Sequence, residues 1–182
     1  MNVNLKTHCL NDVKFVASPN FGDRLSEQDI SLVVIHGISL PPNKFGGNGV
    51  EQLFCNKLNP NEHPYYQKIY QLKVSAHLFI KRTGDIIQFV PFSKKAWHAG
   101  QSIFDGRCAC NDFSIGIELE GTDELPYTEQ QYSQLNKILA ELRKAYPNIT
   151  DVVGHSDIAP GRKTDPGDFF DWSIISGCAV SS

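Results

Sequence analysis

The sequence predicts an α/β protein in which a central β-sheet is flanked by helices. Short β-branched runs recur along the chain, and a long amphipathic helix precedes the last of them. At 182 residues the chain has the size of one ordinary domain, large enough to bury a core without disulfides. We therefore expect residues 1–182 to form a single domain.

The first expected strands are short and apolar. Residues 32–36 form a β-branched run that ends at His36, and Gly37 after it allows the chain to turn. Residues 74–82 and 86–90 flank Thr83-Gly84-Asp85, which predicts a hairpin with a glycine-containing turn.

Another strand is expected over residues 113–119, and its two faces differ in character. Alternate side chains of a strand point to opposite faces. The apolar face carries Phe113, Ile115, Ile117 and Leu119, and the other carries Ser114, Gly116, Glu118 and Glu120. The second face is therefore available for a purpose other than packing, and Gly116 leaves room there for a ligand.

The clearest helix begins after Thr128, where Gln131 completes a capping box, and it must stop before Pro147. Its apolar stripe has the spacing of a helix with one face against a core: Tyr132, Leu135, Ile138, Leu139, Leu142 and Tyr146. A short strand is expected next, over residues 150–153. Shorter helices are expected around 50–58 and over 169–175.

A loop rich in Gly and Pro, residues 154–167, carries an imidazole, an ammonium and carboxylates. Its bends allow these groups to converge on one point. His36, at the end of its strand, is the expected partner from elsewhere in the chain. Together His36, His155 and Asp165 would bind a zinc ion and leave one coordination position open, as in catalytic zinc sites.

Such a site predicts hydrolysis, because zinc lowers the pKa of bound water from about 15.7 to about 7. The reaction also needs a proton shuttle and a group that stabilises the developing oxyanion. Glu118, on the polar face of its strand, is the candidate for the shuttle. Lys163 is the candidate for the second role, because an extended connection through Thr164 would place it on the same side as Asp165.

The residues alone leave other ligand sets open. His63, His77 and His98 could also bind the metal, and His77 is the strongest of these because it lies in an expected strand. Cys108-Ala109-Cys110 is weak evidence for a thiolate site without a second pair. Free thiols are expected at all five cysteines, Cys9, Cys55, Cys108, Cys110 and Cys178.

The composition indicates which classes of partner the protein binds. A net charge of -3 argues against nucleic-acid binding, which most often uses a basic surface. The first residues lack the pattern of a secretory signal, and no run approaches the roughly 18 apolar residues of a membrane span. We therefore expect a cytoplasmic protein, a monomer with a small-molecule partner.

Taken together, several motifs closely resemble the AmpD family of cytosolic N-acetyl-anhydromuramyl-L-alanine amidases. The resemblance runs in unbroken order from about Phe15 to Trp172. The motifs that carry it are Val34-Ile35-His36, Val74-Ser75-Ala76-His77, Ala96-Trp97-His98-Ala99-Gly100, and the segments 40–47, 60–65, 111–121 and 155–167.

The resemblance implies a single domain with a central mixed sheet flanked by helices, a fold shared with peptidoglycan recognition proteins. It implies zinc on His36, His155 and Asp165, and leaves His77 and His98 outside the ligand set. It also implies catalytic groups at Glu118 and Lys163 with Tyr65 nearby. We expect substrate contacts from Lys73, Trp97 and Arg107. The implied substrate is an anhydromuropeptide, cleaved at the amide between the lactyl group and L-alanine.

The chain departs from the family pattern at three positions. Gly37 stands where familiar members have Asn, Lys73 where they have Arg, and Ala109 where a basic residue is frequent. Lys73 attracts a carboxylate without the bidentate fork of Arg, and we expect Arg107 to compensate. Asp165 stands where catalytic peptidoglycan recognition proteins and a phage lysozyme of the amidase type typically have Cys. Together with the missing secretory signal, this favours an enzyme of cell-wall recycling over a secreted wall hydrolase.

Three other functions compete with this interpretation. A muropeptide-binding sensor predicts a damaged catalytic set, and none of the five proposed residues is missing. A non-haem iron oxygenase also uses two histidines and a carboxylate, and His155-Ser156-Asp157 supplies a His-x-Asp pair. A lysin acting on intact cell wall is the third alternative.

Overall fold

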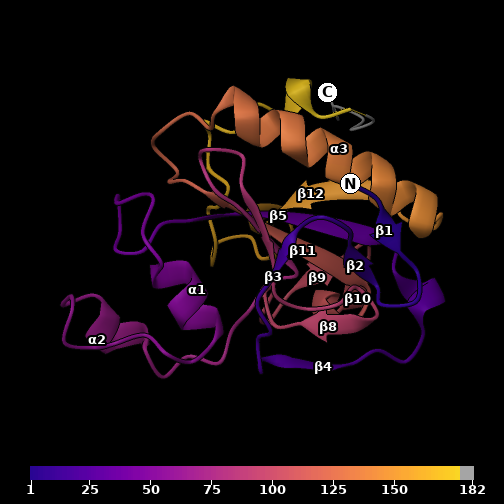
Figure 1. Cartoon of the computed structure of the whole chain (residues 1–182). Coiled ribbons are helices and arrows are strands. Elements are labelled where there is room, and N and C mark those ends of the chain that lie inside the picture. Colours follow the sequence, from indigo (N-terminus) through magenta and orange to yellow (C-terminus); the bar gives the residue numbers. More distant parts are fainter. Residues whose placement is uncertain (177–182) are drawn as a thin grey trace.

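The computed structural model, which describes residues 1–176, has a six-stranded mixed sheet at its centre (Figure 1). Only β6 and β7 pair antiparallel, and the other neighbours are parallel. The mixed sheet that the sequence resemblance implied is therefore confirmed. In spatial order its strands are β12 (Asp151–Gly154), β5 (Leu32–Ile38), β11 (Ser114–Glu120), β6 (Leu78–Ile80), β7 (Ile86–Gln88) and β3 (Lys14–Phe15).

Six further short strands form three antiparallel pairs outside this sheet. They are β1 (Val3–Asn4) with β2 (Cys9–Leu10), β4 (Phe21–Asp23) with β8 (Lys94–Ala96), and β9 (Ile103–Phe104) with β10 (Arg107–Cys108).

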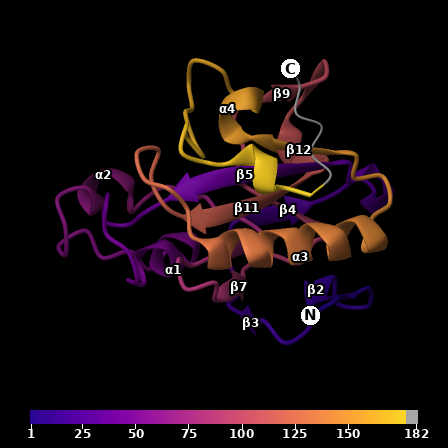
Figure 2. The same cartoon turned by 90° about the horizontal axis from the view of Figure 1, so that it is seen from above.

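Helix α3 (Glu129–Ala145) lies across one face of the central sheet (Figures 1 and 2). Its capping box is present, because Thr128 accepts from the Gln131 backbone and the Gln131 side chain accepts from the Thr128 backbone. Each fully buried aliphatic side chain contributes roughly 1.5–3 kcal/mol. The core on this face joins Leu135, Ile138, Leu139 and Leu142 of the helix to Ile115, Ile117 and Leu119 of β11.

The opposite side of the sheet is covered by smaller elements. Helix α1 (Gly49–Phe54) packs Val50, Leu53 and Phe54 against Phe79 and Phe89. Helix α2 (Tyr66–Ile69) follows it, and in both views the two lie at the same end of the molecule (Figures 1 and 2). Helix α4 (His155–Ile158) contributes Ile158 to a third core cluster with Leu32 and Val34 of β5.

The structure differs from the expected elements at several places, and the strand expected over 86–90 and the helix expected around 50–58 are shorter, ending at Gln88 and Phe54. The strand expected over 74–82 is limited to β6, since Ser75 bonds instead to the Trp97 carbonyl. Residues 169–175 form only the 3-10 turn Trp172–Ile174, which the Asp171 side chain caps. Residues 155–158, expected as loop, are helical. Gly37 lies inside β5 rather than at a turn.

Two further 3-10 turns, Glu27–Asp29 and Cys110–Asp112, complete the described elements. Along residues 1–176 no helix has the length and apolar composition that a membrane crossing requires.

Candidate metal centre and active-site cleft

Three adjacent parallel strands end at the same edge of the sheet, and this edge carries the site. Glu118 of β11 stands in register with His36 of β5, and Gly154 of β12 pairs with Ile35. His155 follows Gly154 as the first residue of α4. Carboxyl ends of neighbouring parallel strands are where α/β sheets place ligands. Residues far apart in sequence therefore meet here.

His36, His155 and Asp165 converge on one point. The two Nδ1 atoms lie 2.9 Å apart, and Asp165 Oδ2 lies 3.2 Å from His36 Nδ1 and 3.1 Å from His155 Nδ1. Ligands at zinc bond lengths of about 2.0–2.1 Å in a tetrahedron are separated by about 3.3 Å. The triangle therefore fits an ion of this size, and its two nitrogens and one oxygen are a donor set that zinc accepts.

The protonation states of His36 and Asp165 also suit a cation. Burial lowers the pKa of His36 to about 4, and the neighbouring Asp165 carboxylate opposes this only in part. Burial disfavours ionisation of Asp165, but its close contacts with the His155 and His36 imidazoles outweigh burial and hold its pKa well below the usual range. Near neutral pH His36 is uncharged and Asp165 is a carboxylate, the forms that bind metals.

The loop that carries Asp165 is held at several points. The Ser156 N–H donates to the Asp165 carbonyl at 3.0 Å, and the Tyr127 hydroxyl donates to the Pro166 carbonyl at 2.9 Å. A side chain at residue 37 would overlap that hydroxyl. Gly37 is thus required by the close approach of Tyr127, and the turn expected at this residue was wrong.

A cleft of about 410 Å³ opens over the candidate metal centre. The expected catalytic groups Glu118, Lys163 and Tyr65 all line it, together with Trp97. Thr164 turns the other way and bonds to Asp123, so Lys163 and Asp165 do share one side.

Glu118 is buried, and its Oε2 has no hydrogen-bond partner within residues 1–176. Burial raises its pKa well above the ordinary value, the charge of Asp165 adds to this, and Lys163 opposes it. A carboxyl group of this kind is suited to exchanging a proton with a ligand in the cleft.

The two expected basic contacts do not join this lining. Lys73 is exposed between Leu72 and Val74, which do line the cleft. Arg107 bonds to both carboxylate oxygens of Asp29, at 2.9 and 3.0 Å, and its guanidinium lies 3.9 Å from the centre of the Phe113 ring. The compensation expected from Arg107 therefore finds no support in this arrangement.

The other histidines have different partners. His77 Nδ1 accepts from the Gly116 N–H at 3.0 Å, and its Nε2 lies 2.9 Å from the Lys94 carbonyl. His63 accepts from the Tyr65 N–H. His98 fills the space above Gly116, where a ligand was expected, and contacts His36 from behind. Within residues 1–176 the group that could hold a metal ion contains none of these three histidines.

Sequence reasoning missed the residues that support the site. No sequence pattern indicated a role for Tyr127, and Asn111 lay inside a quoted motif without an assigned role. His98 was considered only as a ligand. Cys9, Cys55, Cys108 and Cys110 are free thiols as expected, and Cys178 lies outside the described residues.

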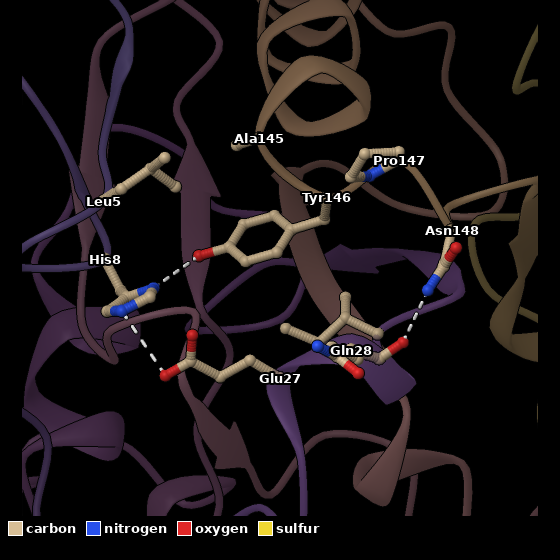
Figure 3. Close-up of a pocket in the computed structure, with 9 residues that line it drawn as sticks. Leu5, His8, Glu27, Gln28, Ala145, Tyr146, Pro147 and Asn148 are labelled. Carbon is tan, nitrogen blue, oxygen red and sulfur yellow. Dashed lines mark hydrogen bonds and ion pairs between the residues drawn. The ribbon is translucent and has the colours of Figure 1, made fainter.

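A second pocket, of about 300 Å³, lies where the N-terminal segment meets the end of α3 (Figure 3). His8 Nδ1 lies 2.8 Å from the Tyr146 hydroxyl, and His8 Nε2 lies 3.4 Å from Glu27. Asn148 donates to the Gln28 carbonyl across the same pocket. These polar groups bond to one another, which is typical of a structural cluster.

Residues 26–168 match the family described as N-acetylmuramoyl-L-alanine amidase, and the chain belongs to that family. The 1,6-anhydro-N-acetylmuramyl-L-alanine amidase AmpD of Haemophilus influenzae is 54% identical over 165 residues, which cover 90% of each chain. These matches place the chain with the AmpD proteins, as the sequence resemblance predicted.

Solved structures agree with this assignment. A crystal structure of a selenomethionine AmpD derivative is 50% identical, with a TM-score of 0.92 and coverage of 96% of this chain and 97% of that one. The amidase AmiD from E. coli, solved with anhydro-N-acetylmuramic acid-L-Ala-D-gamma-Glu-L-Lys, is 28% identical with a TM-score of 0.59 and coverage of 80% and 55%. The recognition protein PGRP-SA of Apis mellifera, 14% identical with a TM-score of 0.61 over 92% and 100%, shows the shared fold.

Proposed function

We propose that this protein is a zinc-dependent amidase that hydrolyses the amide between the lactyl group of anhydro-N-acetylmuramic acid and L-alanine in soluble muropeptides. The observation that carries the proposal is the convergence of His36, His155 and Asp165 beneath a cleft that Glu118 and Lys163 also line. The names of the similar AmpD proteins and the ligand of AmiD support this substrate class.

The three ligands would hold zinc, which supplies a hydroxide nucleophile at neutral pH and polarises a carbonyl oxygen. Glu118 acts as the proton shuttle: it would take the proton that water loses when the hydroxide forms, and would deliver this proton to the nitrogen of L-alanine as the C–N bond breaks. The raised pKa of Glu118 suits the second half of this exchange. The Lys163 ammonium stabilises the oxyanion that develops at the carbonyl.

The walls of the cleft would bind the remainder of the substrate. Trp97 offers an aromatic surface, and Tyr65 reaches the same cleft from the N-terminus of α2. Lys73, exposed at the rim, attracts a carboxylate of the stem peptide as a point charge. In this proposal the protein acts as a cytoplasmic monomer in cell-wall recycling.

The test is incubation of the metal-replete protein with a purified anhydromuropeptide and identification of the products by mass spectrometry. Release of intact stem peptide and anhydro-N-acetylmuramic acid supports the proposal. A parallel incubation uses whole sacculi. Solubilised sacculi together with unchanged muropeptide would instead indicate a lysin, and muropeptide binding without turnover would indicate a sensor.

A further inference from the structure

Two consecutive residues, His98 and Ala99, contact the two imidazoles of the candidate metal centre at Nε2, the ring nitrogen that does not face Asp165. His36 Nε2 lies 2.9 Å from His98 Nδ1, and His155 Nε2 lies 3.2 Å from the Ala99 carbonyl oxygen. Both residues lie between β8 and β9, so one short loop supplies the outer partner of each imidazole.

The direction of the hydrogen bonds behind His36 follows from the backbone. The Cys110 carbonyl can only accept, so the Ser114 hydroxyl donates to it at 2.6 Å. The hydroxyl has no second proton and therefore accepts from His98 Nε2 at 3.2 Å. A neutral imidazole protonated at Nε2 has its lone pair on Nδ1, and that atom accepts from the Nε2–H of His36.

The consequence reaches the metal centre. With its proton on Nε2, His36 presents the Nδ1 lone pair to the point that it shares with Asp165. The Ala99 carbonyl likewise holds the proton of His155 on Nε2, which leaves the second Nδ1 as an acceptor. Two lone pairs and a carboxylate oxygen therefore face one another, and a bound cation would offset the repulsion between these three acceptors.

Two features fix the position of this loop. The side-chain oxygen of Asn111 accepts from the backbone N–H of His98 at 3.1 Å and of Ala99 at 2.9 Å. Gly116 lies beneath the His98 ring, where any side chain would overlap it. The imidazole of His98 is thus placed by its own backbone and by the strand under it.

We propose that His98 is a positioning residue: the relay from the Cys110 carbonyl through Ser114 and His98 sets the tautomer of His36, and Asn111 clamps the loop that serves both imidazoles. The inference rests on the proposed function for the identity of the metal. It concerns metal affinity and geometry rather than contact with substrate.

The experiment measures zinc dissociation constants by chelator competition, with the visible spectrum of the cobalt-substituted protein as a second readout. His98→Phe keeps a ring but removes the acceptor, so we expect zinc binding to weaken by about 10- to 100-fold and the cobalt bands to shift. His98→Asn, whose side-chain oxygen replaces Nδ1, should recover part of the affinity. Melting of the metal-free variants establishes that each one folds.

The end of the relay is tested by Ser114→Ala, which should weaken zinc binding by roughly three- to tenfold. Its matched control is Ser18→Ala, another buried serine that donates to a backbone carbonyl, that of Phe54 at 2.6 Å, and this variant should bind zinc like the parent. Asn111→Leu should weaken zinc binding, and Asn111→Asp, which keeps an acceptor oxygen, should restore part of it.

The outcomes separate the two proposals. If the parent protein binds zinc and cleaves muropeptide while folded His98→Phe and Ser114→Ala bind zinc as tightly, this inference is overturned and the function stands. Nitrogen NMR of the zinc-loaded protein provides a further check, since a proton on His98 Nδ1 would also contradict the relay. A parent protein that binds no zinc would overturn the proposed function itself.

Discussion

Two histidine-containing regions of the molecule differ in how their polar groups are paired. At the pocket in Figure 3, His8 has a partner at each ring nitrogen, Tyr146 and Glu27. At the cleft, the outer nitrogens of His36 and His155 are also bonded, but their Nδ1 atoms face each other and Asp165. A histidine cluster therefore indicates a metal site when several hydrogen-bond acceptors meet, rather than when ionisable residues are merely close.

The largest contrast should come from removing one imidazole in each region. His36→Ala removes a metal ligand, so zinc affinity should fall by on the order of 10³-fold or more and activity should fall to background. His8→Ala leaves the buried hydroxyl of Tyr146 without its partner and should cost about 1–3 kcal/mol of stability with normal zinc content. Zinc analysis and urea unfolding of both variants check this. Full zinc occupancy in His36→Ala would show that His36 is not a zinc ligand.

Glu118 separates chemistry from metal binding within the cleft. Because Glu118→Ala removes proton transfer and no ligand, the variant should retain one zinc and lose on the order of 10² to 10⁴ in turnover. Steady-state kinetics on a defined anhydromuropeptide and zinc analysis of the same sample measure both quantities. Near-normal turnover would deprive Glu118 of its catalytic role.

The buried carboxyl of Glu118 also predicts a pH dependence of stability. Its pKa is raised in the folded protein from 4.5, so its contribution to stability is fully present below about pH 4.5 and is lost as the pH rises toward the folded pKa. In the metal-free protein at pH 7, Glu118→Gln should therefore raise the free energy of unfolding by about 1–3 kcal/mol. Thermal melts from pH 4 to 8 should show this gain shrinking toward pH 4. A gain that is independent of pH would exclude ionisation as its cause.

Gly37 tests how the ligand loop is held. Gly37→Ala would overlap the Tyr127 hydroxyl that bonds to Pro166, so we expect a loss of about 1–3 kcal/mol in stability. Gly47→Ala is the matched control, because its side chain would lie 3.7 Å from the Leu40 carbonyl, an ordinary contact. Equal melting temperatures for the two variants would show that Tyr127 moves aside without cost.

Much of the fold could be predicted because local signals agree with the final structure. The capping box at Thr128 and the Pro after the helix bound α3 closely, and β-branched runs located β5 and β12. The helix predicted over 169–175 is longer than the turn that forms. Its apolar residues pack separately: Phe170 and Ile175 are buried, while the 3-10 turn between them has no buried residue.

The convergence of His36, His155 and Asp165 was predictable, and the residues that support them were less so. Asp165 and His155 share a loop of unusual composition, and His36 was expected as their partner because it ends a buried strand. The position of His98 depends on which strand lies beneath it and on a distant asparagine, and spacing along the chain carries no such information. Arg107 illustrates the same limit, because its partner Asp29 is brought to it only by the fold.

The most direct test of the metal centre is a zinc titration of the metal-free protein with activity measured at each step. Amidase activity should rise in proportion to added zinc and reach a plateau at one equivalent per chain. Full activity in the metal-free protein, or a plateau that zinc does not produce and iron does, would contradict the account.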